Sequence, residues 1–169
     1  MNTKQTVLGI VLFAVFWAFQ AGYANSLGVS AWFAGAIIFV ILLWAIGKSS
    51  MPKKQPAEVQ RFWNFVVVLA LVATFIASYV MPYLGAVYPP GFTYAAFTPL
   101  LLSIWLILFG SAMLAEGLNT KNTMETWFGA FWLLGSVTFL APGIAPNAYL
   151  HFAMIAGLPN IIAGLVAKK

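Results

Sequence analysis

The chain has 169 residues, of which 63% are hydrophobic and only 7% are charged. Soluble domains carry about 25% charged residues, so this composition excludes an ordinary water-soluble domain. The net charge of +5 falls in short segments beside apolar runs, which is not the pattern of a nucleic-acid-binding surface. The sequence contains no cysteine, which excludes disulfides, thiolate metal sites and cysteine nucleophiles.

Six long apolar stretches occupy nearly the whole sequence, and a transmembrane helix needs roughly 20 apolar residues. The stretches are continuously apolar, whereas the strands of a membrane β-barrel alternate between apolar and polar residues. We therefore predict an all-α integral membrane protein, a six-helix bundle that forms a single domain over residues 1–169. The predicted helices span residues 5–23, 28–48, 60–82, 93–116, 125–141 and 147–167.

Charged side chains occur only in alternate linkers. Lys4 precedes the first stretch, charged residues recur within 48–61 and 116–125, and Lys168 and Lys169 follow the last stretch. The linkers near 22–28, 85–91 and 142–147 carry no charge. Because cationic loops stay cytoplasmic, we predict a multi-pass protein of the cell membrane, with three helical hairpins and both termini in the cytoplasm. The acidic residues of these linkers are expected on a solvated face: Glu58, Glu116 and Glu125.

Two prolines lie inside predicted helices, Pro99 and Pro159. An interior proline removes a backbone hydrogen bond and kinks the helix, and the freed carbonyls can line a water-filled cavity. Thr98, Ser103 and Asn160 flank these kinks and supply neutral hydrogen-bonding groups. Two interpretations stay open: contacts to a small solute, or kinks within an inert packed bundle.

Six further side chains are candidate pore or solute contacts. His151 lies near the uncharged end of the last helix, either as a pH-sensitive gate or as an interfacial histidine reached by water. The amides of Gln20 and Asn64 are either ligand groups or helix-packing contacts. Three tryptophans are predicted deeper in the bilayer, where they pack between helices or line a pore: Trp17, Trp105 and Trp132.

No ionisable residue falls at the predicted midplane of the bilayer. Ion-coupled transporters usually carry one there, and a cation channel uses an acidic ring or a filter of carbonyls. No catalytic constellation is visible, so we expect no enzyme activity, no metal, no cofactor and no nucleic-acid partner. What remains is a passage for a small neutral or protonated solute, or a protein that only packs against others.

Several short segments match motifs of known transporters, beginning with Leu8-Gly9-Ile10 and Gln20-Ala21-Gly22. Further matches are Met81-Pro82-Tyr83-Leu84-Gly85, Asn147-Ala148, His151-Phe152-Ala153 and Gly157-Leu158. Together they resemble the acetate/succinate uptake transporter family, although the proline motif that opens that family is missing. The resemblance implies a six-helix protomer, a homohexamer with a pore in each protomer, and Phe13 as a side chain that narrows the pore.

A second set of segments lies in the predicted second, third and fifth helices. It comprises Gly35-Ala36-Ile37-Ile38-Phe39, Leu43, Gly47-Lys48, Trp63-Asn64-Phe65 and Trp127-Phe128. These segments resemble the urea and short-amide channel family, which is also hexameric. That family begins outside the membrane, whereas here a helix precedes the match.

We therefore expect a membrane channel or facilitator for a small organic solute, with a monocarboxylate such as acetate as the first candidate. A hydrophobic constriction is predicted near Phe13. The expected partners are the lipid bilayer, the solute and further copies of the chain. Two alternatives stay open: a urea or short-amide channel, and a non-transporting structural or assembly subunit of a membrane complex.

Overall fold

The computed structural model describes residues 3–22, 37–38, 41, 56–80, 94–141 and 143–166. Within these ranges the backbone forms helices and turns and no strand, which confirms the predicted all-α class for this part of the chain. The predicted helix at 28–48 lies mostly outside the described residues, and the described positions within it, Ile37, Ile38 and Ile41, are helical.

Three helices are long and apolar enough to cross a membrane: Ala57–Val80, Thr98–Thr120 and Ala145–Val166. The first has 24 residues, which at 1.5 Å per residue makes about 36 Å and exceeds the roughly 30 Å hydrocarbon core of a bilayer. The described elements are α1 (Thr3–Gln20), α3 (Ala57–Phe75), π-helix η1 (Ile76–Val80), α5 (Tyr94–Thr120), α6 (Thr123–Thr138), 3-10 turn η2 (Ala145–Asn147), α7 (Ala148–Phe152), π-helix η3 (Ala153–Gly157) and α8 (Leu158–Val166).

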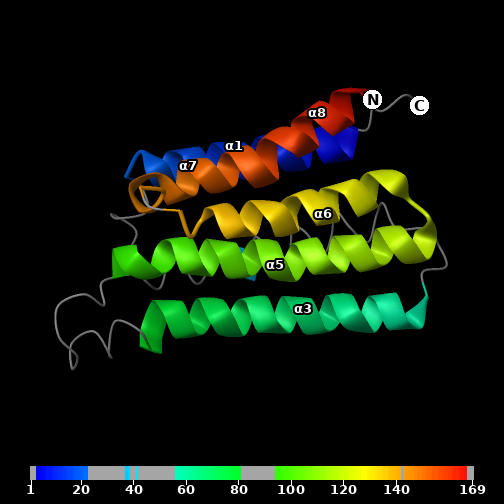
Figure 1. The fold of residues 1–169 in the computed structure, drawn as a ribbon, viewed down its shortest axis with the longest axis horizontal. Helices are drawn as coiled ribbons and strands as arrows, with labels where there is room; N and C mark the ends of the chain where they lie inside the picture. Colours follow the sequence, from blue (N-terminus) through cyan, green and yellow to red (C-terminus); the bar gives the residue numbers. More distant parts are fainter. Residues whose placement is uncertain are drawn as a thin grey trace.

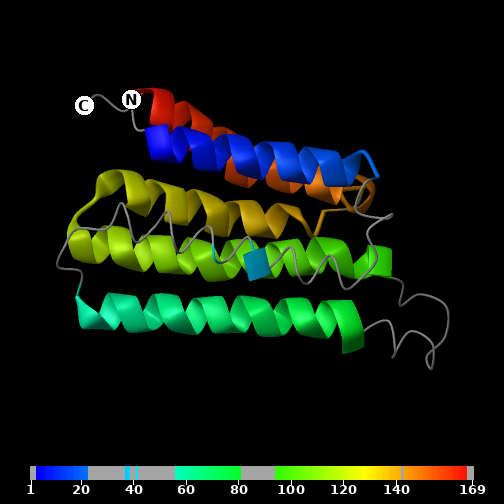
Figure 2. The same ribbon diagram turned by 180° about the vertical axis from the view of Figure 1, so that it is seen from behind.

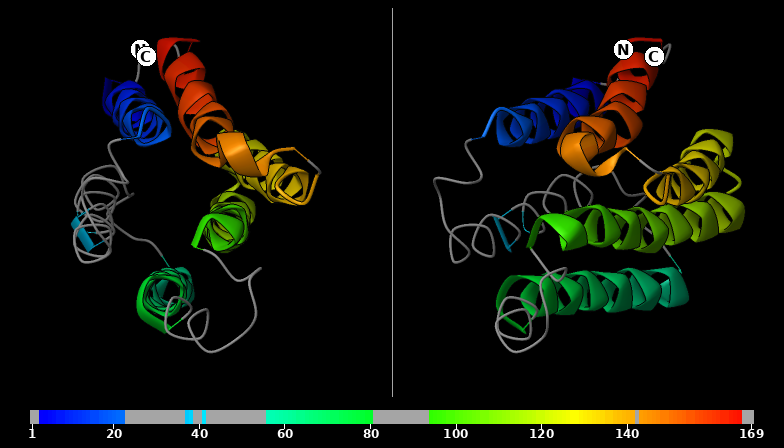
Figure 3. Two further views of the ribbon diagram at one scale, coloured as in Figure 1. Left: turned by 90° about the vertical axis from the view of Figure 1, so that its left-hand side faces the viewer. Right: turned by 60° about the vertical axis from the view of Figure 1, so that its left-hand side comes forward.

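The described helices run side by side in a bundle with α5 and α6 at its centre (Figure 1). Helix α3 packs on one side of α5, and α1 packs along α7, η3 and α8 on the other side of the central pair. The view from behind shows α1 lying in front of the last helix (Figure 2). The end-on view shows α1 and the last helix on one side of the central α5–α6 pair (Figure 3). The first and last helices of the chain are therefore neighbours.

The described charged side chains gather at one end of the bundle. The start of α1, the start of α3, the turn between α5 and α6, and the end of α8 all share that end (Figure 1). Glu58 and Arg61 lie in the first turns of α3, and Glu116, Lys121 and Glu125 border the α5–α6 turn. This arrangement agrees with the alternation of charged and neutral linkers in the sequence.

The turn between α5 and α6 is shorter than the predicted linker, because α5 continues to Thr120 and α6 begins at Thr123. Lys121 adopts a left-handed backbone with φ 55°. The side-chain oxygen of Asn122 then accepts hydrogen bonds from the backbone N–H groups of Met124 at 3.2 Å and Glu125 at 3.4 Å. This N-cap satisfies donors that the first turn of α6 leaves free.

Glycines allow α5 and α6 to approach closely. A Cβ atom at Gly129 would overlap the backbone of Leu114, and one at Gly117 would overlap the backbone of Thr126. Small residues at such crossings permit the close packing on which helix association in lipid depends. These two positions therefore fix the distance between the central helices.

The last helix is interrupted by a π-turn just before Pro159. Proline has no N–H group and clashes with the carbonyl of the preceding turn. The wider turn η3 accommodates it, and the Leu158 N–H bonds the carbonyl of Ala153, five residues back. The Asn160 side chain donates to the Ala156 carbonyl at 2.7 Å. The other π-turn, η1, also ends two residues before a proline in the sequence, Pro82.

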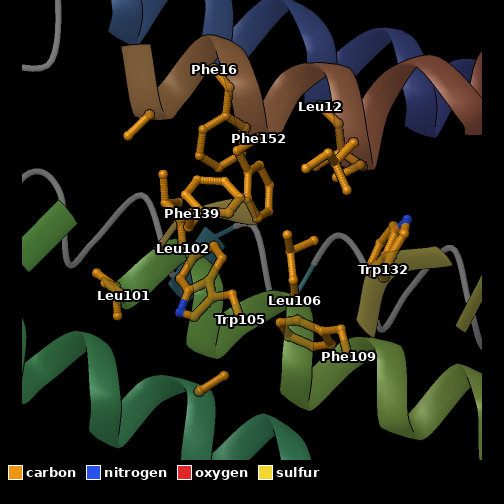
Figure 4. Close-up of a cluster of buried hydrophobic side chains, with 14 of the residues drawn as sticks. Leu12, Phe16, Leu101, Leu102, Trp105, Leu106, Phe109, Trp132, Phe139 and Phe152 are labelled. Carbon is orange, nitrogen blue, oxygen red and sulfur yellow. The ribbon is translucent and has the colours of Figure 1, made fainter. Parts of the chain in front are cut away.

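Aromatic rings link the layers through the core (Figure 4). Trp63 of α3 lies 6.3 Å from Phe109 of α5, measured between ring centroids, and Phe109 lies 6.3 Å from Trp105. Trp105 lies 6.4 Å from Phe152 of α7, which lies 4.3 Å from Phe16 of α1. Aromatic pairs at such distances add to the stability gained by burial, so this row joins α3, α5, α7 and α1.

Candidate functional site

A buried polar contact joins α3 to α5 inside the apolar bundle. The hydroxyl of Thr74, which has no exposed surface, donates to the Ala70 carbonyl at 2.7 Å. The same oxygen accepts a hydrogen bond from the indole N–H of Trp105 at 3.1 Å. The polar groups of these two side chains are thus satisfied within the protein, and their role is to hold the two helices together.

Ser78 lies four residues beyond Thr74, on the same face of the helix and within the π-turn η1. Its side chain is 1% exposed. Among the described residues its hydroxyl has no hydrogen-bond partner. A buried polar group without a partner costs roughly 1–3 kcal/mol, and such a group calls for an explanation. The Ser78 hydroxyl is therefore positioned to bind water or a ligand.

Trp132 of α6 carries the second such group. Its side chain is 7% exposed, and its indole N–H has no partner in the part of the chain that the structure describes. Helix α6 can bring this ring into the core because Gly110 faces it, and a Cβ atom at Gly110 would lie 3.1 Å from the Trp132 Cβ. Within the described part of the chain, Trp132 therefore presents an unpaired donor among apolar side chains (Figure 4).

The predicted group around Pro99 lies in the bundle interior. Thr98, Pro99 and Ser103 are all buried in α5. The Ser103 hydroxyl donates to the Ser136 carbonyl of α6 at 2.9 Å. The structure thus buries both Thr98 and Ser103 in α5, and it gives the Ser103 hydroxyl a packing contact to α6.

Gln20 and His151 both lie at the uncharged end of the bundle, where each bonds different partners. The Gln20 amide donates to the Pro146 carbonyl at 2.8 Å and accepts from the Leu150 N–H at 3.2 Å. His151 Nε2 lies 2.6 Å from the hydroxyl of Thr138. Each of these predicted site residues joins the end of one helix to the start of the last one.

The two predicted aromatic pore residues of α1 take different positions. Phe13 is half-buried and packs against the core. A Cβ atom added at Gly157 would lie 3.0 Å from the Phe13 Cβ, so Phe13 sits where α1 crosses the last helix. Trp17 is 56% exposed and points away from the packed interior of the described residues.

The two remaining amides lie apart from each other. Asn64 is exposed on α3 and accepts a hydrogen bond from Gln60 at 3.4 Å. Asn160 is 3% exposed and bonds the Ala156 carbonyl next to the Pro159 kink. The predicted polar residues therefore form no single cluster but lie along the bundle from the charged to the uncharged end.

The expectation that Glu116 faces solvent is wrong. Its side chain is only 7% exposed, and its Oε2 atom accepts a hydrogen bond from the Trp63 indole at 2.7 Å. Because α5 continues past Glu116, this residue lies against the first turns of α3, where the Trp63 indole bonds its carboxylate in place of water. Bonds to a charged acceptor are stronger than neutral ones, so this contact ties the charged ends of α3 and α5 together.

Sequence reasoning did not select Ser78. It named Trp132 as one of three deep tryptophans that either pack between helices or line a pore, and it did not single out the indole N–H. The available signal for Ser78 was its four-residue spacing from Thr74 within a long apolar run, which places both hydroxyls on one helix face. Within the described ranges, no three histidine or acidic side chains lie together as metal ligands would.

The described part of the chain thus defines an all-helical bundle with three helices long and apolar enough to span a membrane. Its interior carries two buried polar groups without partners. No protein-family model, curated protein or solved structure matches the chain.

Proposed function

We propose that the protein is an integral membrane channel or facilitator for a small organic solute, a short monocarboxylic acid such as acetate. The observation that carries the proposal is the hydroxyl of Ser78, which has no partner among the described residues and is buried in a helix long enough to span a bilayer. A hydroxyl both donates and accepts, and an undissociated carboxylic acid does the same. Ser78 therefore offers a matching pair of hydrogen bonds to such a solute.

The chemistry of the buried groups favours the neutral acid over the anion. Away from the charged end, the buried polar side chains of the described helices are hydroxyls, an amide and indoles, such as Ser78, Asn160 and Trp132. An isolated carboxylate loses far more free energy than a neutral group on leaving water. Groups of this kind suit a solute that crosses in its protonated form.

The proposal places the narrowest part of the passage near Phe13, where α1 meets the last helix. The charged end of the bundle faces the cytoplasm in this arrangement, with both termini on that side. The outer face of α6 exposes several large apolar side chains to lipid or to further copies of the chain in a homo-oligomer. The most exposed of them are Trp127, Leu134 and Val137.

The test is a flux measurement on purified protein in liposomes that contain a pH-sensitive dye. An acetate gradient is imposed, and urea-driven volume change is measured in parallel. Acidification of the lumen well above the rate in protein-free liposomes is the expected result. A response to urea alone would indicate a short-amide channel. No response to either solute would favour a structural or assembly subunit and contradict the proposal.

A further inference from the structure

Two buried tryptophans of the core differ in one respect. Trp105 is 2% exposed and donates its indole N–H to Thr74 at 3.1 Å. Trp132 is 7% exposed, and within the described helices its N–H has no acceptor. Tryptophan usually finds a partner for its N–H when it is buried. Among the described residues, Trp105 thus uses its indole N–H for packing, while the N–H of Trp132 is left available.

The orientation of Trp132 directs this donor away from its aromatic neighbour. Figure 4 shows its nitrogen on the side of the ring turned away from Phe109 and toward the layer of α1 and α8. The labelled side chains nearest to it in that view, Leu106 and Leu12, are apolar and at most 1% exposed. No side-chain acceptor from these residues competes for the N–H.

This environment selects the chemistry of the ligand. The indole N–H is a donor only, so the ligand must present an acceptor such as a carbonyl oxygen. One neutral donor among apolar side chains does not compensate the desolvation of an anion. A compact, uncharged molecule with a carbonyl oxygen meets both conditions, as does a short amide or an undissociated carboxylic acid.

We propose that Trp132 is a binding residue whose indole N–H donates to the carbonyl oxygen of a small uncharged solute inside the bundle. The inference deepens the proposed function and rests on it for the view that the solute crosses the membrane. Ser78 lies in η1, the π-turn that follows α3, and Trp132 lies on α6, so they mark two separate contacts rather than one pocket.

The test observes the indole groups directly. Protein labelled with ¹⁵N-tryptophan is prepared in nanodiscs, and the Trp132 and Trp105 N–H signals are assigned from Trp132→Phe and Trp105→Phe. Acetamide and acetate are then titrated at about pH 4, where carboxylic acids are largely protonated, and at about pH 8. We expect acetamide to shift the Trp132 signal saturably at both pH values, acetate to shift it only at the lower one, and Trp105 to stay unchanged.

Two results would overturn the assignment: a Trp132 signal that no probe moves and that exchanges rapidly with water, or equal shifts of all indole signals. If acetate flux persists with either result, the proposed function survives and the Trp132 site does not. If the Trp132 signal shifts but no flux occurs, the binding site stands and the transport function fails. Trp132→Phe, which keeps the ring and removes the donor, should lower acetate flux roughly threefold to tenfold.

Discussion

The side chain of Gln20, the last residue of α1, caps the start of the final helix through the backbone N–H of Leu150. Its Oε1 atom accepts that N–H at 3.2 Å, while its Nε2 atom donates to the Pro146 carbonyl at 2.8 Å. Only one orientation of the amide satisfies both contacts, because the reversed amide would place oxygen against oxygen. One neutral side chain therefore joins the two chain-terminal helices at the uncharged end.

Replacing Gln20 with methionine keeps the length of the side chain but removes both hydrogen bonds. The free energy of unfolding should fall by about 1–2 kcal/mol, since each bond contributes roughly 1 kcal/mol. Thermal unfolding in detergent, followed by circular dichroism, measures the change. The matched control is Gln60→Met, which removes only a 3.4 Å surface contact to Asn64 and should change stability by less than about 0.5 kcal/mol. Equal effects of the two variants would contradict the capping role of Gln20.

Two glycines of α6 should respond differently to alanine. A Cβ atom at Gly129 meets the backbone of Leu114, which cannot move without separating α5 from α6. At Gly135 the nearest atoms to the Cβ all belong to the side chain of Ile155, with Cγ2 at 2.6 Å, and not to the backbone of another helix. Gly129→Ala should therefore destabilise the protein by about 2–3 kcal/mol through overpacking, and Gly135→Ala by less. A larger loss of stability for Gly135→Ala would show that the helix crossing is not set at Gly129.

The contact between Trp63 and Glu116 should stabilise the charged end. Trp63→Phe removes the donor and leaves the buried carboxylate with one bond fewer, which should cost about 1.5–3 kcal/mol. Glu116→Gln keeps an acceptor oxygen for the indole and should cost less than Trp63→Phe. Trp127→Phe is the control, because Trp127 is 72% exposed. Chemical unfolding in detergent compares the three variants, and a loss for Trp127→Phe as large as that for Trp63→Phe would refute a specific role for this bond.

Substituting Phe13 tests whether the constriction lies at this residue. Phe13→Ala removes the ring at the crossing of α1 with the last helix, so the proposed passage should widen, with faster flux and weaker discrimination between acetate and larger carboxylic acids. Trp17→Ala, on the exposed side of the same helix, is the control and should leave both quantities unchanged. Unchanged flux and selectivity in Phe13→Ala would place the constriction elsewhere.

The helical class and the long apolar helices were predictable because both depend on composition along the chain. Apolar length marks the spans, and the linker charges mark one end of the bundle, which is where the structure places Arg61 and Lys121. The α5–α6 turn was predicted too long. A polar segment such as 118–120 continues a helix readily when a left-handed residue at 121 and an N-cap at 122 follow it.

The polar interior was harder to predict, because it depends on which helices become neighbours. Nothing in the local sequence indicates that Glu116 meets the Trp63 indole, 53 positions away. The same holds for the difference between Trp105, which finds Thr74, and Trp132, which finds no partner among the described residues. Hydroxyl groups within apolar runs were visible in the sequence, but whether each hydroxyl finds a hydrogen-bond partner depends on how the helices pack.

The most direct test of the proposed transport function compares two serine variants in the liposome assay. Ser78→Ala removes a hydroxyl without a partner, so it should leave stability unchanged or slightly higher and reduce acetate flux severalfold. Ser103→Ala removes a hydroxyl bonded to the Ser136 carbonyl, so it should cost about 1 kcal/mol of stability and leave flux near the wild-type value. Acetate flux no faster than in protein-free liposomes would contradict the transport proposal, and flux equally fast in the wild type and Ser78→Ala would contradict the role of Ser78 in it.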